Sequence, residues 1–400
     1  MRRTLLSLLM LAACGPEPDA EPLVVAAAPR EPDAPALRLV TEDPSDAPIA
    51  GLDDAALVRF EDGDARFEMP FRDAQGLGPL FVQRACTGCH EDDGRGPGVV
   101  RRIVAADGIA LPFGDVLRPR TTAGARTPLL APEHARETVR LPLAVFARGY
   151  LEAIPDETLL AAEAAQARGE DGVSGRAARL DTVDDTASIF GATAPALGRF
   201  GHKARTATLE GFVADALRGD MGLTSPSRPD ELPNPDRLTD DLRPGVDVGG
   251  DVVALLAEYV RLLALPRREL DAHARGAALF DEVGCARCHA PSARTRADHP
   301  NVALRDVEVA LYTDLLLHDM GEGLADGIDE GAATGREWRT APLIGVRHLR
   351  GLLHDGRAAT VGDAIAHHAS EGSEASASVA RYAALSSADQ ARIVAFVEAL

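Results

Sequence analysis

Aromatic side chains and positive charge are both scarce in this 400-residue sequence. Aromatic residues make up 4% of the chain, with 1 tryptophan. Alanine and leucine are abundant instead, which favours helices over sheets. The formal net charge of -20 repels phosphate backbones, which argues against nucleic acid as a partner. The same acidic surface would attract a small basic protein.

Long apolar segments are also missing beyond the N-terminus, so no transmembrane helix is predicted there. At the N-terminus, a basic start (Met1-Arg2-Arg3) precedes a short apolar stretch that ends in Leu11-Ala12-Ala13-Cys14. This ending resembles a bacterial lipobox. We predict that residues 1–13 are a signal peptide and that Cys14 is lipidated. Its acyl chains would hold the exported protein at the periplasmic face of a bacterial membrane. A plain secretory signal with an incidental cysteine is the alternative.

Cysteine is rare, and its placement is informative. One of the 5 cysteines is Cys14, and the other four form Cys86-Thr87-Gly88-Cys89-His90 and Cys285-Ala286-Arg287-Cys288-His289. No cysteine is left for a disulfide bond. In a CxxCH motif the two thiols add to the vinyl groups of a haem, and the histidine becomes the proximal iron ligand. A zinc ribbon or a thioredoxin-like motif needs a different context.

The two motifs predict two covalently bound haem c groups. Cys86, Cys89, Cys285 and Cys288 would attach them, and His90 and His289 would bind the irons.

The chain divides into a tether and two related halves. Residues 14–50 are rich in Pro, Asp, Glu and Ala and are too polar to fold alone. Helical spacing of apolar residues predicts helices over 251–265, which Pro266 stops, and from Ser387 to the end, with Ser387 and Gln390 as a capping box. We predict haem domains over 51–265 and 266–400.

An internal repeat supports two related domains. Leu80-Phe81 and Leu279-Phe280 stand at the same distance before their CxxCH motifs, and each pair is expected on a helix. Downstream, the His202 to Leu209 segment parallels His354 to Val361. The first half carries extra residues near 91–190. The predicted fold is therefore mainly α, with two cytochrome c-like haem domains, long irregular loops and an insertion in the first domain.

Several segments of the sequence resemble those of a known family, the bacterial dihaem oxidoreductases, which are related to dihaem cytochrome c peroxidases. The resemblance covers roughly residues 70–400. The segments that carry it are Tyr150–Pro155, Asp171–Gly175, Gly198–Ala204, Asp220–Ser225, Tyr312–Gly321, Trp338–Pro342 and Leu353–Ala358. The sequence departs from the family at His202, where relatives usually have a tryptophan that could assist electron transfer between the haems.

The resemblance implies different distal sides for the two haems. In the second half it places His368 as the sixth ligand, with Met320 as the alternative. In the first half the repeat puts Ala216 at the position of His368. Asp220 falls near the family's distal acid/base group. The alternatives are that Met221 binds that iron, or that Asp220 is a loop residue that bonds its own backbone. His202 is a further catalytic candidate.

The expected function is that of a haem-dependent oxidoreductase of peroxidase type. Electrons would come from a small redox donor protein or a quinol-linked cytochrome, and would pass from the C-terminal haem to the N-terminal haem, where peroxide or another small oxidant reacts. The alternatives are a lipid-tethered electron-transfer cytochrome without enzymatic activity and an enzyme that oxidises a protein or thiol partner. The resemblance also implies a calcium site, although no loop shows a calcium motif. Arg101 and Arg102 could pair with haem propionates.

Overall fold

The computed structural model describes residues 46–91, 98–104, 111–122, 127–132, 135–169, 172–181, 183–185, 188–190, 192–238 and 245–400. The predicted signal peptide, Cys14 and nearly all of the tether lie outside these residues. Residues Glu31–Leu400 form one compact unit. Within the described residues, no helix is long and apolar enough to cross a membrane.

Helices and short strands are mixed in this unit, so the expectation of a mainly α fold holds only in part. The helices are α1 (Asp54–Glu68), α2 (Arg148–Glu152), α3 (Asp156–Gln166), α4 (Leu209–Met221), α5 (Gly250–Leu262), α6 (Ala274–Glu282), α7 (Val361–His367), α8 (Ser376–Ala383) and α9 (Ser387–Ala399).

The β structure of the described residues consists of short antiparallel pairs of strands. The pairs are β1 (Leu80–Phe81) with β3 (Arg120–Thr121), β2 (Val100–Val104) with β4 (Arg136–Arg140), β5 (Ala178–Leu180) with β8 (Ala196–Gly198), β6 (Asp184–Asp185) with β7 (Ala192–Thr193), β9 (Ala293–Arg294) with β10 (Glu308–Val309), and β11 (Leu317–Asp319) with β12 (Glu337–Arg339).

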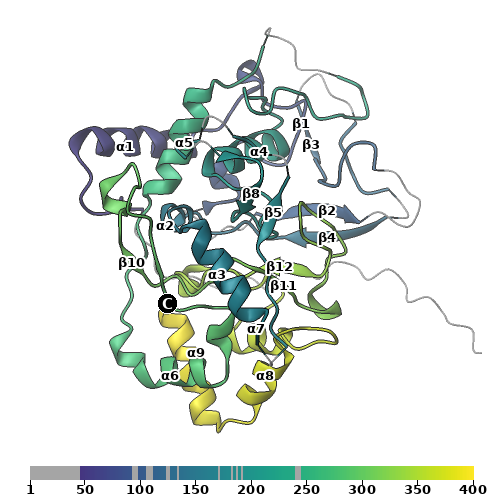
Figure 1. Cartoon of the computed structure of the whole chain (residues 1–400). Coiled ribbons are helices and arrows are strands. Elements are labelled where there is room, and N and C mark those ends of the chain that lie inside the picture. Colours follow the sequence, from purple (N-terminus) through teal and green to yellow (C-terminus); the bar gives the residue numbers. More distant parts are fainter. Residues whose placement is uncertain are drawn as a thin grey trace, which may run out of the picture. The chain divides into compact units, whose positions relative to one another are not determined.

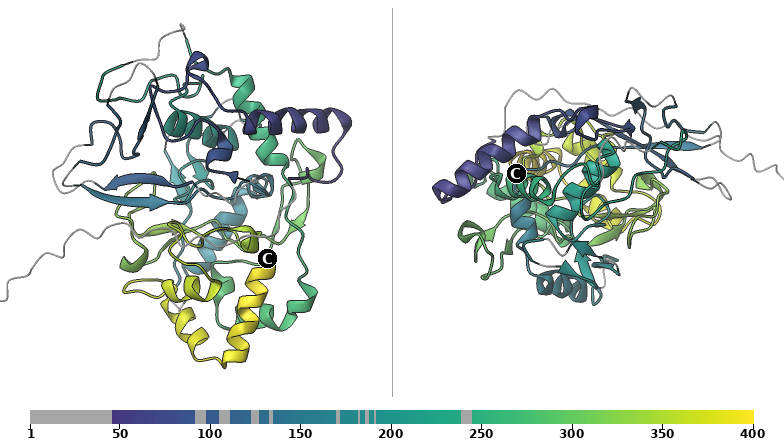
Figure 2. Two further views of the ribbon diagram at one scale, coloured as in Figure 1. Left: turned by 180° about the vertical axis from the view of Figure 1, so that it is seen from behind. Right: turned by 90° about the horizontal axis from the view of Figure 1, so that it is seen from above.

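Two hydrophobic cores lie behind the two CxxCH motifs. The larger core joins α1, α2, α4 and α5, and it also takes in Leu304, Leu311, Leu315 and Ile344 from beyond residue 266. The smaller core joins α6, α7 and α9. Figure 1 shows α1, α4 and α5 toward one end of the 31–400 unit, α6 to α9 toward the other, and β11 and β12 between them. The yellow C-terminal helices stay apart from the purple α1 when seen from behind (Figure 2). The predicted boundary near residue 265 stays a prediction.

The two predicted helices form, with one change at a cap. Helix α5 ends at Leu262, slightly before Pro266. Helix α9 begins at Ser387, but the capping side chain is that of Ser386, which accepts a hydrogen bond from the backbone N–H of Asp389. The predicted capping box at Ser387 is therefore wrong by one residue. Gln390 instead donates to carbonyl groups at the end of α8 and in the turn that follows it.

The Leu-Phe pairs of the repeat differ in structure. Leu279 and Phe280 lie in α6, as expected. Leu80 and Phe81 instead form β1, whose partner residues are Thr121 and Arg120. Their ladder pairing with β3, which follows the motif in the chain, takes the place of helical hydrogen bonds. The expectation of a helix before the first motif is therefore wrong.

The downstream part of the repeat is preserved. The hydroxyl of Thr208 caps α4 by accepting from Gly211 N–H, and the hydroxyl of Thr360 caps α7 by accepting from Asp363 N–H. The two helices therefore start at matching residues, and residues at equal spacing from each threonine are equivalent.

Candidate haem sites

The C-terminal CxxCH motif forms a tight turn that brings both thiols and the imidazole together. Cys285–Arg287 is a 3-10 helix, and the N–H of His289 donates to the carbonyl oxygen of Cys285 at 3.0 Å. Nδ1 of His289 lies 3.0 Å from the carbonyl oxygen of Tyr312, which fixes the ring and leaves Nε2 for a metal. Burial lowers the pKa of His289 to about 4. The imidazole is therefore neutral, as a metal ligand must be.

The N-terminal motif repeats this turn. Cys86–Gly88 is a 3-10 helix, and the N–H of His90 donates to the carbonyl oxygen of Cys86 at 2.8 Å. Burial raises the pKa of Cys86 and Cys89 to about 12. Burial, helped by the charge of Arg148, lowers the pKa of His90 to about 4. Nδ1 of His90 meets no hydrogen-bond partner in the described part of the chain.

Each motif opens onto its own cavity. The C-terminal cavity, of about 300 Å³, is lined by Cys285, Cys288 and His289 and mainly by apolar side chains. The N-terminal cavity, of about 90 Å³, is lined by Cys86, Cys89 and His90. Apolar walls, paired thiols and a neutral imidazole are the features that a covalently bound haem requires, so the residues at both sites fit the group.

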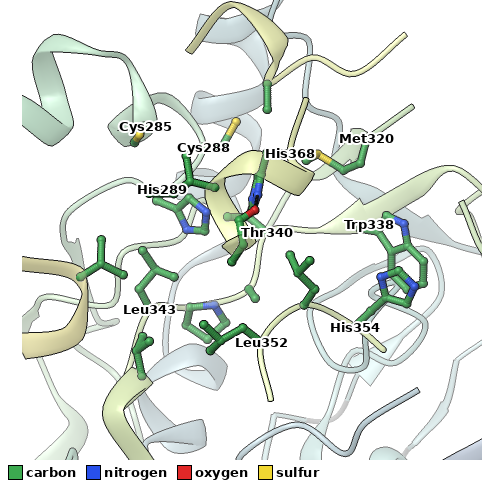
Figure 3. Close-up of a pocket in the computed structure, with 18 of the residues that line it drawn as sticks. Cys285, Cys288, His289, Met320, Trp338, Thr340, Leu343, Leu352, His354 and His368 are labelled. Carbon is green, nitrogen blue, oxygen red and sulfur yellow. Dashed lines mark hydrogen bonds between the residues drawn. The ribbon is translucent and has the colours of Figure 1, made fainter. Parts of the chain in front are cut away.

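His368 and Met320 both reach the C-terminal cavity. His368 follows α7, and its Nδ1 lies 2.7 Å from the carbonyl oxygen of Ala364, so its Nε2 is left for another partner. Burial lowers its pKa, which keeps the ring neutral. Figure 3 draws His289, His368 and Met320 around the same part of the cavity. The structure thus brings together the residues predicted for this haem, and the choice between His368 and Met320 stays a prediction.

Asp220 and Met221 lie on the N-terminal cavity at the end of α4, together with Ala216. The carboxyl of Asp220 is only half-buried by surface area because it faces the cavity. Desolvation by the surrounding protein nevertheless raises its pKa to about 6, although Arg205 and Arg102 act in the opposite direction. No hydrogen bond to this carboxyl occurs among the described residues. It is therefore a carboxyl that holds its proton up to about pH 6.

His202 lies on the C-terminal cavity and does not line the N-terminal one. Its Nε2 is 2.8 Å from the carbonyl oxygen of Leu141, and burial lowers its pKa to about 4. The ring meets Trp338 edge-on, with centroids 6.1 Å apart, and Trp338 stacks on His354 (Figure 3). A catalytic role for His202 stays a prediction, but its place is beside the tryptophan and away from Asp220's cavity.

His318 is a site residue that the sequence did not single out. Its Nε2 lies 3.0 Å from Asp314 Oδ2, its Nδ1 lies 2.8 Å from Glu374 Oε2, and the sulfur of Cys288 is 3.6 Å away. Burial alone would lower its pKa, but hydrogen bonds to Asp314, Cys288 and Glu374 raise the pKa well above the usual value. His318 belongs to the Tyr312–Gly321 segment, which could have drawn attention to it.

This cluster does not resemble a calcium site. Cys288, Asp314 and His318 are the one group of three or more metal-binding side chain types that converges within the described ranges, and their ligand atoms lie within 4.8 Å of one another. Calcium takes six to eight oxygen ligands, whereas this group offers a sulfur, a nitrogen and one carboxylate.

Arg101 and Arg102 form ion pairs away from both cavities. Arg101 pairs with Glu137 at the surface, and Arg102 pairs with Asp115 and Glu330. Neither arginine lines either cavity. The expectation that they meet haem propionates therefore finds no support. Arg148 and Arg339, which the sequence did not point to, line both cavities.

A comparison with protein-family models agrees with this chemistry. A family model described as "Di-haem oxidoreductase, putative peroxidase" matches residues 118–400, beyond the first CxxCH motif. No curated protein matches the chain. Among solved structures, hydrazine synthase from Kuenenia stuttgartiensis is similar at 15% identity and a TM-score of 0.40, with 96% of this chain and 100% of that chain covered. A MauG-like protein associated with microbial copper homeostasis is similar at 14% identity and a TM-score of 0.39, with 94% of each chain covered.

Proposed function

Because the chain belongs to the di-haem oxidoreductase family, we propose that it is a periplasmic dihaem c-type oxidoreductase of peroxidase type. Its C-terminal site takes up electrons, and its N-terminal site is where a small oxidant such as peroxide reacts. The lipid anchor at Cys14 and a small redox donor protein or quinol-linked cytochrome are parts of the same proposal.

The difference between the two cavities carries this proposal. Beside His289, the residue that follows α7 is His368, whose imidazole can complete an iron's coordination. Beside His90, the equivalent residue on α4 is Ala216, whose methyl group cannot bind a metal. An iron with two protein ligands carries electrons, whereas an iron with a vacant position can bind a substrate.

Asp220 supplies the proton chemistry that such a reaction needs. When bound, the haem supplies the electrons for reduction of the oxidant. The chain's own contribution is a carboxyl that faces the N-terminal cavity with a pKa raised to about 6, so it keeps its proton in mildly acidic solution, where an ordinary carboxyl has lost it. Proton donation by a positioned acid is worth about 10²–10⁴ in rate.

Peroxide turnover tests the proposal. The fully reduced, haem-loaded protein is mixed with hydrogen peroxide, and re-oxidation is followed by absorbance. We expect rapid re-oxidation of both haems, with turnover when a reduced donor is supplied. If peroxide fails to re-oxidise the protein at any pH, the peroxidase function is wrong.

Met221 supports the second candidate, an electron carrier without enzymatic activity. Met221 is buried, and it lines the N-terminal cavity next to Asp220. If its sulfur bound the iron, both sites would be closed. Replacing Met221 with leucine separates the two functions, because a carrier would gain a reactive site while a peroxidase would keep the one it has.

A further inference from the structure

The wall between the two cavities contains two buried arginines that form no ion pair among the described residues. The residues common to both cavities are Leu143, Ala144, Arg148 and Arg339. Arg148 lies in α2 and is 8% exposed, and Arg339 ends β12 and is 4% exposed. No carboxylate of the described chain forms an ion pair with either guanidinium.

Most of the other buried arginines among the described residues are paired with a carboxylate. Four of the five contact one directly, in the pairs Arg102–Glu330, Arg140–Asp326, Arg199–Asp156 and Arg261–Glu152, and the fifth, Arg118, donates to backbone carbonyl oxygens. A buried charge without a counter-charge costs several kcal/mol. Two such charges side by side in one wall therefore need an explanation beyond packing.

The donors of Arg148 and Arg339 are only partly used. Nε of Arg148 donates to the carbonyl oxygen of Ala144 at 2.6 Å. Nε of Arg339 donates to Gly201 and its Nη1 donates to Thr340, both to carbonyl oxygens. Both Nη atoms of Arg148 and Nη2 of Arg339 have no hydrogen-bond partner among the described residues. Burial lowers the pKa of Arg148 to about 9, and the charge of Arg339 adds to this effect. Burial also lowers the pKa of Arg339 to about 10, although the charge of Asp314 acts in the opposite direction.

Because both guanidinium groups line both cavities, an anion in either cavity could pair with them. Guanidinium groups bind carboxylates through two parallel hydrogen bonds. A haem carries two propionate carboxylates, and the CxxCH motifs place one such group in each cavity. A propionate of either haem that pointed at this wall would meet both arginines.

We propose that Arg148 and Arg339 form one carboxylate-binding site that holds a propionate of each haem and so couples the two haems electrostatically. This inference rests on the covalent haems of the proposed function and adds a role for the wall between them. A positive charge near an iron disfavours its more positive, oxidised state. Each arginine therefore raises the reduction potential of both haems.

Redox titration of the haem-loaded protein tests this site. We expect Arg148→Gln and Arg339→Gln each to shift the midpoint potentials of both haems to more negative values, with haem content unchanged. Arg118→Gln is the matched control, because Arg118 is also buried without an ion pair, donates only to the carbonyl oxygens of Phe113 and Pro233, and lines neither cavity. It should leave both potentials unchanged.

Two results would overturn the shared site. One is a shift of only one haem, or of neither, in both glutamine variants. The other is an equal shift in Arg148→Lys and Arg148→Gln, since lysine keeps the charge and should preserve much of the potential. The lysine variant also serves if the glutamine variants do not fold. Potentials are measured without peroxide, so absent turnover with intact shifts would reject the peroxidase function and leave the arginine site in place.

Discussion

Ala216 on α4 occupies the position that His368 occupies after α7. Each follows its capping threonine, Thr208 or Thr360, at the same spacing, and each lines the cavity of its own CxxCH motif. An imidazole can bind iron and a methyl group cannot. The two sites therefore differ at an equivalent position of two equivalent helices.

Replacing His368 with alanine should open the C-terminal site. We expect one haem to change its spin state in the absorption and electron paramagnetic resonance spectra, because it loses its sixth ligand, while the spectrum of the other stays the same. Met320→Leu is the paired variant, since Met320 lines the same cavity. A spectral change in Met320→Leu and none in His368→Ala would assign the methionine as the ligand.

Replacing Ala216 with histidine should close the N-terminal site. The new imidazole would stand where His368 stands in the other half, on the cavity that contains His90. We expect the second haem to become six-coordinate and peroxide turnover to fall strongly, while electron uptake at the C-terminal haem continues. Ala216→Leu, which adds volume without a ligand, shows how much of the loss is steric. Unchanged coordination in Ala216→His would mean that α4 and α7 are not equivalent toward their haems.

Turnover should depend on the protonation of Asp220. Because its pKa is raised to about 6, the carboxyl is protonated below that pH and loses its proton as the pH rises through it. We expect kcat/KM for peroxide to fall as pH rises through about 6. Asp220→Asn should remove this transition and lower the rate by about 10²–10⁴, with haem content unchanged. A transition that persists in Asp220→Asn would assign it to another group.

A buried charge network should be important for stability. Nε of Arg261 on α5 lies 2.5 Å from Glu152 of α2, and its Nη2 lies 2.8 Å from Glu210 of α4. Arg261→Met leaves both carboxylates buried without a counter-charge, so we expect a loss of about 3–5 kcal/mol in the free energy of unfolding, measured in urea.

The matched control for this prediction is Arg59→Met. Arg59 pairs with Glu258 of the same α5 helix, but it is solvent-exposed. Arg59→Met should lower the free energy of unfolding by no more than about 1 kcal/mol. Equal losses in the two variants would show that burial of the network contributes nothing.

Local patterns predicted the parts of the structure that depend on neighbouring residues. The spacing within each CxxCH motif predicted that its two thiols and its imidazole lie together, and the turn of each motif brings them together. Helices α5 and α9 followed from the spacing of apolar residues, because a helical face repeats within the segment itself. Leu80 and Phe81 were mispredicted because their strand depends on Thr121 and Arg120, which no local pattern connects to them.

The arginines of the wall between the cavities, and the contacts around His318, could not be predicted from local patterns. Arg148 and Arg339 are far apart in sequence and meet only because α2 and β12 line the same cavities. The pKa of His318 is raised by hydrogen bonds to Asp314 and Glu374, and Glu374 lies in a distant segment. Such contacts depend on tertiary packing, which periodicity and motif spacing do not reveal.

Carbon monoxide binding to the fully reduced protein tests the central claim that the two haems differ. The amount bound is measured by titration against the absorbance change and is compared with total haem. The account predicts one carbon monoxide for every two haems, lost in Ala216→His and doubled in His368→Ala. Binding to neither haem or to both haems in the unmodified protein would contradict it.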